Sequence, residues 1–194
     1  SLCMKKQYKK TIIGLLCLIS ITLMSACSSS LSYNEALQKN ISRIENPEKQ
    51  DDARFLVDAA SYNILATQLA EEAIKSGYSA SVVKMARQNL EEHEEMAKEL
   101  KKLARGEDVT LPAEMNSEHQ QLLAELQSAD RREFDRTYIR ILGDIARDDS
   151  QKFGGMATEA ESEDVRAFAA RKLDHFESHL NELQTVDAEL LRTY

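Results

Sequence analysis

The sequence predicts an all-α protein built as an antiparallel four-helix bundle. Only 6 glycines and 2 prolines occur in 194 residues, so few positions break a helix. Ala, Leu, Glu, Lys, Gln and Arg, which lose little conformational freedom in a helix, are abundant. Apolar residues recur at three- and four-residue spacing after residue 50, and alternating strand patterns are missing. Four amphipathic helices with short connections bury such faces most simply against one another.

The first element is a targeting segment. Lysines at residues 5–10 precede an apolar run over residues 11–24, which is too short to span a bilayer comfortably as a helix. The arrangement is typical of a signal peptide. We therefore assign residues 1–26 to a signal peptide, with residues 1–3 as a short upstream extension before Met4.

The signal peptide ends at a cysteine. Ser25 and Ala26 directly before Cys27 resemble the lipobox of bacterial lipoproteins, a family in which the cysteine is lipidated and becomes the new N-terminus. The resemblance implies an exported lipoprotein that faces the periplasm, held in the outer membrane by the lipid on Cys27. The alternative is an ordinary cleaved signal, or an uncleaved anchor, in which Cys27 is incidental. Residues 27–50 are then the lipid-anchored tether and lead-in.

The body that follows is acidic and has no cysteine. The formal charge is -8, and because the first 26 residues hold four lysines and no acid, the remainder carries -12. Nucleic acid binds chiefly through neutralisation of its phosphates, so we expect no nucleic-acid partner. The body also offers no thiol nucleophile and no thiolate metal ligand.

Within the body, residues 51–194, the apolar spacing predicts four long helices. The first covers residues 51–76, the second runs from residue 79 or 81 to 106, the third begins at residue 128 or 130, and the fourth runs from residue 163 towards the C-terminus. A short helix is expected over residues 117–126. The expected inward stripe of the first helix is Phe55, Ala59, Tyr62, Ala66, Leu69, Ala70 and Ala73, and that of the third is Phe134, Tyr138, Ile141, Ile145, Lys152 and Met156.

Several stretches of the body resemble one family. They are Arg54-Phe55-Leu56, the run from Ala86 to His93, Leu111-Pro112, Phe134-Asp135-Arg136-Thr137-Tyr138-Ile139, Phe168-Ala169-Ala170-Arg171-Lys172-Leu173 and His179-Leu180. Together they look like the bacterial exported family called domain of unknown function 4142, over roughly residues 54–186. The resemblance implies a ferritin-like four-helix bundle with no established activity.

A ferritin-like fold raises the question of a metal centre. Di-iron sites of this fold take a Glu from each of two helices and a Glu-x-x-His from each of the other two, and no Glu-x-x-His occurs in the sequence. A reduced site for iron or zinc remains, with His93, His179 and Asp148 as candidate ligands. The other interpretation is that His93 and His179 are buried, hydrogen-bonded core residues. We expect no cofactor, with iron or zinc as the alternative.

Catalytic patterns give no lead. The sequence has no phosphate-binding glycine loop and no Gly-x-Ser-x-Gly motif. We therefore predict a non-enzymatic, lipid-anchored helical module of the cell envelope, whose partner is an envelope protein or a small ligand. The alternative is a degenerate ferritin-like protein that binds iron or zinc through His93 and His179.

Overall fold

The fold consists of α-helices joined by short loops. The structure, a computed structural model, describes residues 30–193, and the described part contains six helices and no strand. They are α2 (Tyr33–Arg43), α3 (Pro47–Ser76), α4 (Ala80–Gly106), α5 (Ser117–Ser128), α6 (Phe134–Glu159) and α7 (Glu163–Thr193). None of these helices is both long and apolar enough to cross a membrane. The predicted signal peptide and Cys27 lie outside the described residues.

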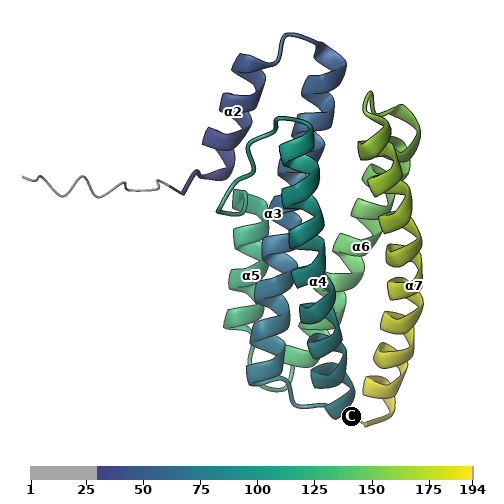
Figure 1. Cartoon of the computed structure of the whole chain (residues 1–194). Coiled ribbons are helices and arrows are strands. Elements are labelled where there is room, and N and C mark those ends of the chain that lie inside the picture. Colours follow the sequence, from purple (N-terminus) through teal and green to yellow (C-terminus); the bar gives the residue numbers. More distant parts are fainter. Residues whose placement is uncertain (1–29, 194) are drawn as a thin grey trace, which may run out of the picture.

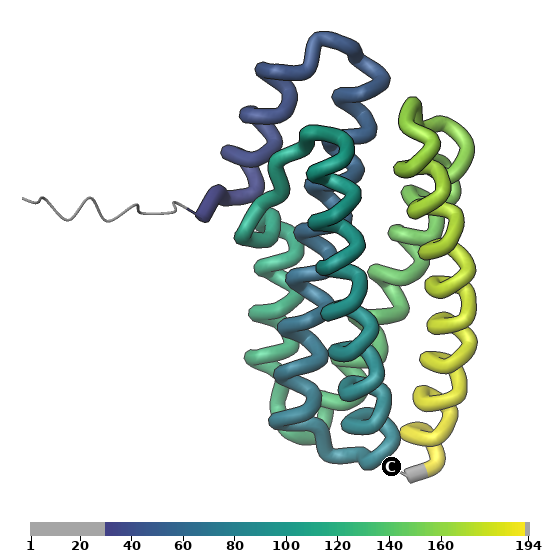
Figure 2. Tube along the Cα trace, in the orientation of Figure 1, coloured from purple at the N-terminus to yellow at the C-terminus, as the bar shows by residue number. Residues whose placement is uncertain are grey.

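Four long helices make up most of the body (Figure 1). Helix α3 packs along α4, and α6 packs along α7, while α3 against α6 and α4 against α7 join the two pairs. The loop after α4 and the helix α5 carry the chain back along the body, so that α6 starts at the end where α4 starts (Figure 2). Neighbouring long helices therefore run antiparallel. The shorter α2 and α5 lie against α3.

The first long helix begins earlier than predicted. Asn46 accepts hydrogen bonds from the backbone N–H groups of Glu48 (2.8 Å) and Lys49 (3.3 Å), and Pro47 occupies the first turn, where a missing N–H has no cost. The Asn-Pro pair thus lies between α2 and α3 and starts the second of these helices. The third long helix begins later than predicted, at Phe134. Asp130 instead accepts from the N–H of Arg132, 3.0 Å away, in the turn before it.

Two buried aspartates join the helix pairs at their ends. Asp52, in the second turn of α3, accepts from the N–H groups of Glu161 (3.1 Å) and Ser162 (2.8 Å), directly before α7. Asp135, in the first turn of α6, accepts from the N–H groups of Tyr78 (3.0 Å) and Ser79 (2.7 Å), directly before α4. Helix α3 therefore satisfies backbone N–H groups at the start of α7, and α6 satisfies those at the start of α4, groups that have no partner within their own helix.

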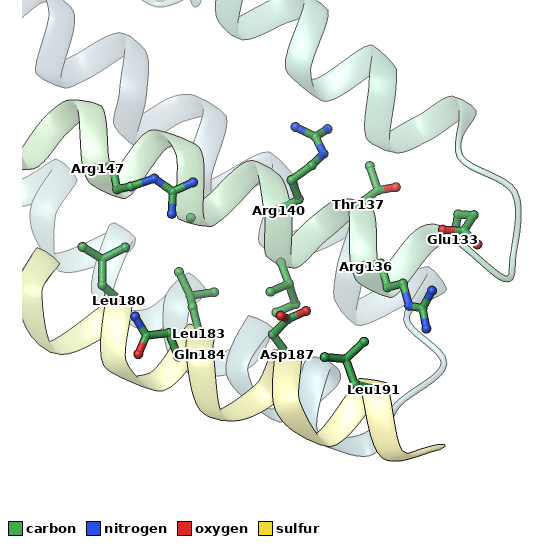
Figure 3. A pocket seen from close by; sticks show the side chains of 12 residues that line it. Glu133, Arg136, Thr137, Arg140, Arg147, Leu180, Leu183, Gln184, Asp187 and Leu191 are labelled. Atoms are coloured by element: carbon green, nitrogen blue, oxygen red, sulfur yellow. The ribbon is translucent and has the colours of Figure 1, made fainter. Parts of the chain in front are cut away.

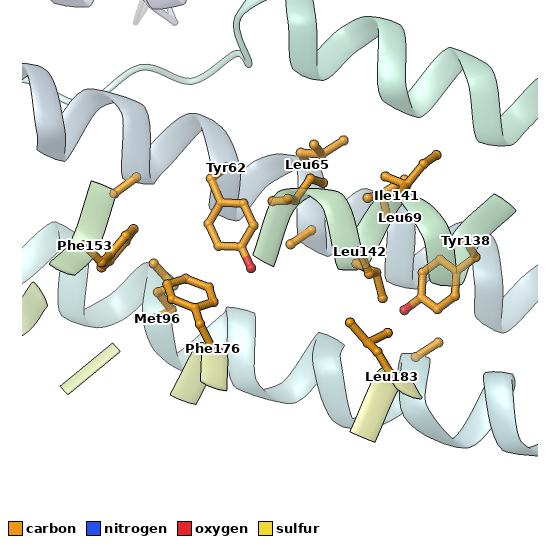
Figure 4. Close-up of a cluster of buried hydrophobic side chains, with 14 of the residues drawn as sticks. Tyr62, Leu65, Leu69, Met96, Tyr138, Ile141, Leu142, Phe153, Phe176 and Leu183 are labelled. Carbon is orange, nitrogen blue, oxygen red and sulfur yellow. The ribbon is translucent and has the colours of Figure 1, made fainter. Parts of the chain in front are cut away.

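The core lies between the four long helices and is centred on aromatic side chains (Figure 4). Phe153 is in edge contact with Phe55 and Phe176, with ring centroids 4.8 Å and 4.9 Å apart. All seven residues predicted for the inward stripe of the first helix are buried. The stripe predicted for the third helix is right as far as Ile145. After it, Asp149 and Phe153 are buried and the predicted Lys152 is exposed, while the predicted Met156 is half-buried and packs against the core.

Candidate functional site

His93 lies in the interior between α3, α4 and α7. Its side chain is 6% exposed, and its ring meets that of Tyr62 edge-on at a centroid distance of 5.3 Å. Its Nδ1 lies 2.9 Å from Oδ1 of Asn63, and because that oxygen only accepts, we place the proton on Nδ1. Burial, followed by the charges of His175 and His179, lowers the pKa of His93 to about 3. The ring is therefore neutral, with Nε2 unprotonated.

Two further histidines follow one another on α7. The rings of His175 and His179 are stacked with centroids 6.0 Å apart, and Nε2 of His175 lies 3.5 Å from a carboxylate oxygen of Glu92 on α4. Burial lowers the pKa of His179 to about 4. The three histidines therefore face one junction between α4 and α7.

A groove of about 340 Å³ opens at this junction, and His93 is part of its lining. Its α4 side is acidic and its α7 side is basic; the charged and titratable residues are Glu91, Glu92 and Glu95 on α4 and Arg171, Lys172 and His175 on α7. Lys172 also bridges to Glu99 at 2.6 Å. The two sides thus attract one another across the groove.

The predicted metal ligands are not assembled into a three-residue site. His93 and His179 both face the α4–α7 junction, but Asp148 is exposed on α6. Among residues 30–193, no group of three or more His, Cys, Asp or Glu side chains is arranged to hold a metal ion. The donor set therefore does not fit a di-iron centre, which needs carboxylates and histidines converging from four helices.

Asp149, next to the predicted Asp148, is a second buried carboxyl group of α6, besides Asp135. It is 6% exposed, and its Oδ2 has no hydrogen-bond partner among residues 30–193. Oδ1 lies 3.9 Å from the ammonium group of Lys152. Burial, opposed by Lys152, raises the pKa of Asp149 to about 7. Helical spacing alone did not separate Asp148 from Asp149, because adjacent residues are about 100° apart on a helix and both flank the predicted stripe.

A serine–histidine pair, which was not predicted from the sequence, lies between α3 and α5. The Ser61 hydroxyl accepts from the N–H of Asn116 at 2.9 Å and lies 2.7 Å from Nδ1 of His119, so we assign it as donor to that nitrogen. Ser61 is 0% exposed, and a substrate cannot reach its oxygen. The pair therefore fixes the start of α5 against the middle of α3. Only the fold brings these residues together, since they are 58 positions apart.

A second cleft, of about 450 Å³, lies between α6 and α7 (Figure 3). Its lining combines leucines and an isoleucine with a polar rim: Glu133, Arg136, Thr137, Ile139, Arg140, Gly143, Arg147, Leu180, Leu183, Gln184, Asp187 and Leu191. Leu183 is buried and Leu191 is exposed, so apolar surface continues from the interior to the rim. No sequence motif marks this cleft, because its residues are only recognisable once α6 and α7 are paired.

Two arginines of the cleft, Arg140 and Arg147, are held in place by carboxylates. Arg140 forms ion pairs with Glu125 of α5 and, at 3.0 Å, with Asp144 one turn later on α6. Arg147 pairs with Asp144 from the other side. Gly143 lies between them, and a Cβ at this position would meet only the Arg147 guanidinium, at 3.5 Å. The missing side chain therefore leaves room in the cleft wall.

Comparison with known proteins gives one result. The sequence model of a family described as "Domain of unknown function (DUF4142)" matches residues 40–186, more than half of the chain, and confirms the predicted resemblance. Searches of curated proteins and of solved structures found no match.

Proposed function

This chain belongs to the DUF4142 family, and we propose that it is a non-enzymatic helical binding module, held at a membrane of the cell envelope by a lipid on Cys27. Its ligand, a small molecule or a segment of an envelope protein, binds in the α6–α7 cleft. The observation that carries the binding role is the cleft itself. Its volume of about 450 Å³ lies in the range of ligand pockets, and such pockets combine apolar walls with a few oriented polar groups.

The finer architecture proposed is a ferritin-like four-helix bundle. Its support is the connectivity: two helix pairs, α3–α4 and α6–α7, are joined by one long connection that contains α5. Bundles of the ferritin-like type have one such crossover.

Photo-crosslinking in bacterial cells tests the binding role. Benzophenone-alanine replaces Gln184, which lines the cleft, and, as the matched control, Glu177, which is exposed on the same helix. We expect an ultraviolet-dependent adduct, identified by mass spectrometry, at position 184 and not at 177. The adduct should disappear when Gly143→Leu fills the cleft. Absence of an adduct at 184, or equal adducts at both positions, contradicts the proposal.

The anchor has a separate test. Replacing Cys27→Ser removes the thiol to which the lipid would be attached. We expect loss of radioactive palmitate labelling and release of the protein from the membrane fraction. Retention of the variant in membranes without label would contradict anchoring through Cys27.

The alternative proposal is iron or zinc binding through His93 and His179. Its support is that both imidazoles face the same α4–α7 junction and that each is neutral, the form in which histidine binds metal. Metal analysis of the purified protein separates the two proposals. Stoichiometric iron or zinc that is lost in His93→Ala and His179→Ala would favour this alternative, and absence of metal after reconstitution would exclude it.

A further inference from the structure

We propose that the protein lies side-on on the membrane, with the surface formed by α2, the loop before α5, and α5 against the lipid headgroups. This inference rests on the proposed lipid anchor at Cys27. It follows from where the described chain leaves the helical body and from how few residues separate that point from the lipid.

The chain is fixed to the body immediately after the anchor. The N–H of Ala113 donates to the carbonyl oxygen of Leu31 at 2.8 Å, and Ser32 with Glu35 forms a capping box at the start of α2. The Tyr33 hydroxyl donates to Asp58 on α3. Position 31 therefore cannot move away from the body without breaking these contacts.

The tether is short. Four peptide units separate Cys27 from Leu31, which span at most about 14 Å when fully extended. The body therefore stays within about 14 Å of the lipid that holds it, whatever path these residues take.

The point of attachment lies near the middle of the long axis. Leu31 is bound by Ala113, in the loop that also contains Asn116. The N–H of Asn116 donates to Ser61, and Ser61 is at the midpoint of the 30-residue helix α3. At 1.5 Å per residue, this midpoint is about 20 Å from either end of the helix. A body standing on either end would place Leu31 farther from the membrane than the tether reaches, so the body must lie on its side.

The side that faces the membrane is fixed by the same contacts. Helix α2 packs on α3, whereas α7 packs on α6 and α4, and the described chain begins on the side of the body opposite α7 (Figure 1). Helix α5 carries little charge, since it contains no Lys or Arg and only two acidic residues, Glu118 and Glu125. Glu125 is already paired with Arg140. With the charges of α2 and of the loop 107–116 included, this surface has a formal charge of -4, so the larger part of the body's -12 lies on other faces.

The experiment uses the absence of cysteine after Cys27. The full chain is expressed with its signal peptide, and the processed lipoprotein is reconstituted in phosphatidylcholine vesicles that contain a nickel-chelating lipid. Single cysteines replace three exposed alanines, Ala113, Ala124 and Ala188, and each carries a nitroxide spin label. Ala113 lies in the loop, Ala124 on α5 and Ala188 on α7.

We expect severalfold stronger relaxation of the label by headgroup nickel at positions 113 and 124 than at 188. Equal relaxation at all three positions, or stronger relaxation at 188, overturns the side-on orientation. The parent protein is the control for the anchor itself. If it accepts spin label or fails to fractionate with the vesicles, Cys27 is not lipidated and the proposed anchor fails, which is a result distinct from a wrong orientation.

Discussion

At the scale of single residues, the buried carboxyl group of Asp149 and the buried imidazole of His93 respond to pH in opposite directions. The pKa of Asp149 is raised to about 7, so the folded state holds its proton more tightly than the unfolded state. Stability is then lost as pH rises from about 4 through 7. The pKa of His93 is lowered to about 3, so stability is lost as pH falls from about 6.5 towards 3.

Replacing Asp149→Asn should stabilise the protein at alkaline pH. The amide keeps the shape of the protonated carboxyl group and removes the cost of a buried charge whose Oδ2 has no hydrogen-bond partner in the described part of the chain. We expect a gain on the order of 3 kcal/mol at pH 8 and little gain at pH 4.5, measured by urea unfolding followed by circular dichroism. Asp148→Asn, at the exposed neighbouring position, is the control. An equal gain from both variants would show that the gain reflects net charge and not burial.

Replacing His93→Gln should weaken the response to acid. Glutamine retains a donor for Asn63 but does not titrate, so the variant lacks the cost of protonating a buried ring. Between pH 7 and pH 4.5 the parent should lose on the order of 2–3 kcal/mol more than the variant. His119 and His179, whose pKa values burial also lowers, contribute to the acid loss that remains. If the variant and the parent lost the same unfolding free energy between pH 7 and pH 4.5, His93 would already be protonated in the folded protein.

At the scale of helices, the capping aspartates connect elements that are distant in sequence. Asp52 is 3% exposed and its two acceptor bonds satisfy the turn before α7, 109 and 110 residues away. Replacing Asp52→Ala should cost about 2–4 kcal/mol, because two hydrogen bonds to a carboxylate are lost and two backbone donors are left unsatisfied. Chemical denaturation provides the measurement. Asp51→Ala, at the exposed neighbouring position, should change stability by less than about 0.5 kcal/mol.

Two glycines should respond oppositely to alanine. In α6, Gly143→Ala adds a Cβ whose nearest neighbour is the flexible Arg147 side chain at 3.5 Å, so the gain in helix propensity should stabilise by about 1 kcal/mol. At the end of α3, Gly77→Ala would place its Cβ 2.5 Å from the carbonyl oxygen of Ala73, which requires a backbone shift and should destabilise by about 1–3 kcal/mol. Thermal unfolding of both variants tests the pair. A stabilising Gly77→Ala would mean that this turn has free space.

The helices also show how far the sequence alone could go. Composition and apolar spacing predicted the all-α fold and placed α4 within a residue of its observed bounds, because its stripe and its flanking glycine agree. The stripe of α6 was lost after Ile145, since Asp149 is a charged residue at a core position and local spacing favours an apolar residue there. The interpretation of His93 as a buried, hydrogen-bonded residue is confirmed, but its partner Asn63 and the α6–α7 cleft could not be predicted, because both depend on contacts between distant segments.

At the scale of the whole molecule, α2 connects the tether to the helical body. Asn40 is fully buried and forms two hydrogen bonds with the backbone of Thr110, each 2.8 Å long. Arg43 adds an ion pair with Asp108 in the same loop. If these contacts and those of Leu31 and Tyr33 were lost, the first fixed residue would be near Asn46, and the reach from Cys27 would grow from about 14 Å to about 65 Å.

Replacing Asn40→Ala should therefore affect both stability and orientation. Removing both hydrogen bonds leaves the Thr110 N–H and carbonyl groups unsatisfied, which should cost about 2 kcal/mol in urea unfolding. As α2 loosens, the longer reach allows the body to tilt, so the difference in nickel relaxation between labels at positions 113 and 188 should shrink. Ser42→Ala is the control, because Ser42 is exposed on α2 and bonds only within its own helix. An unchanged relaxation difference in a clearly destabilised Asn40→Ala protein would show that the contacts of Leu31 and Tyr33 suffice to hold the body on its side.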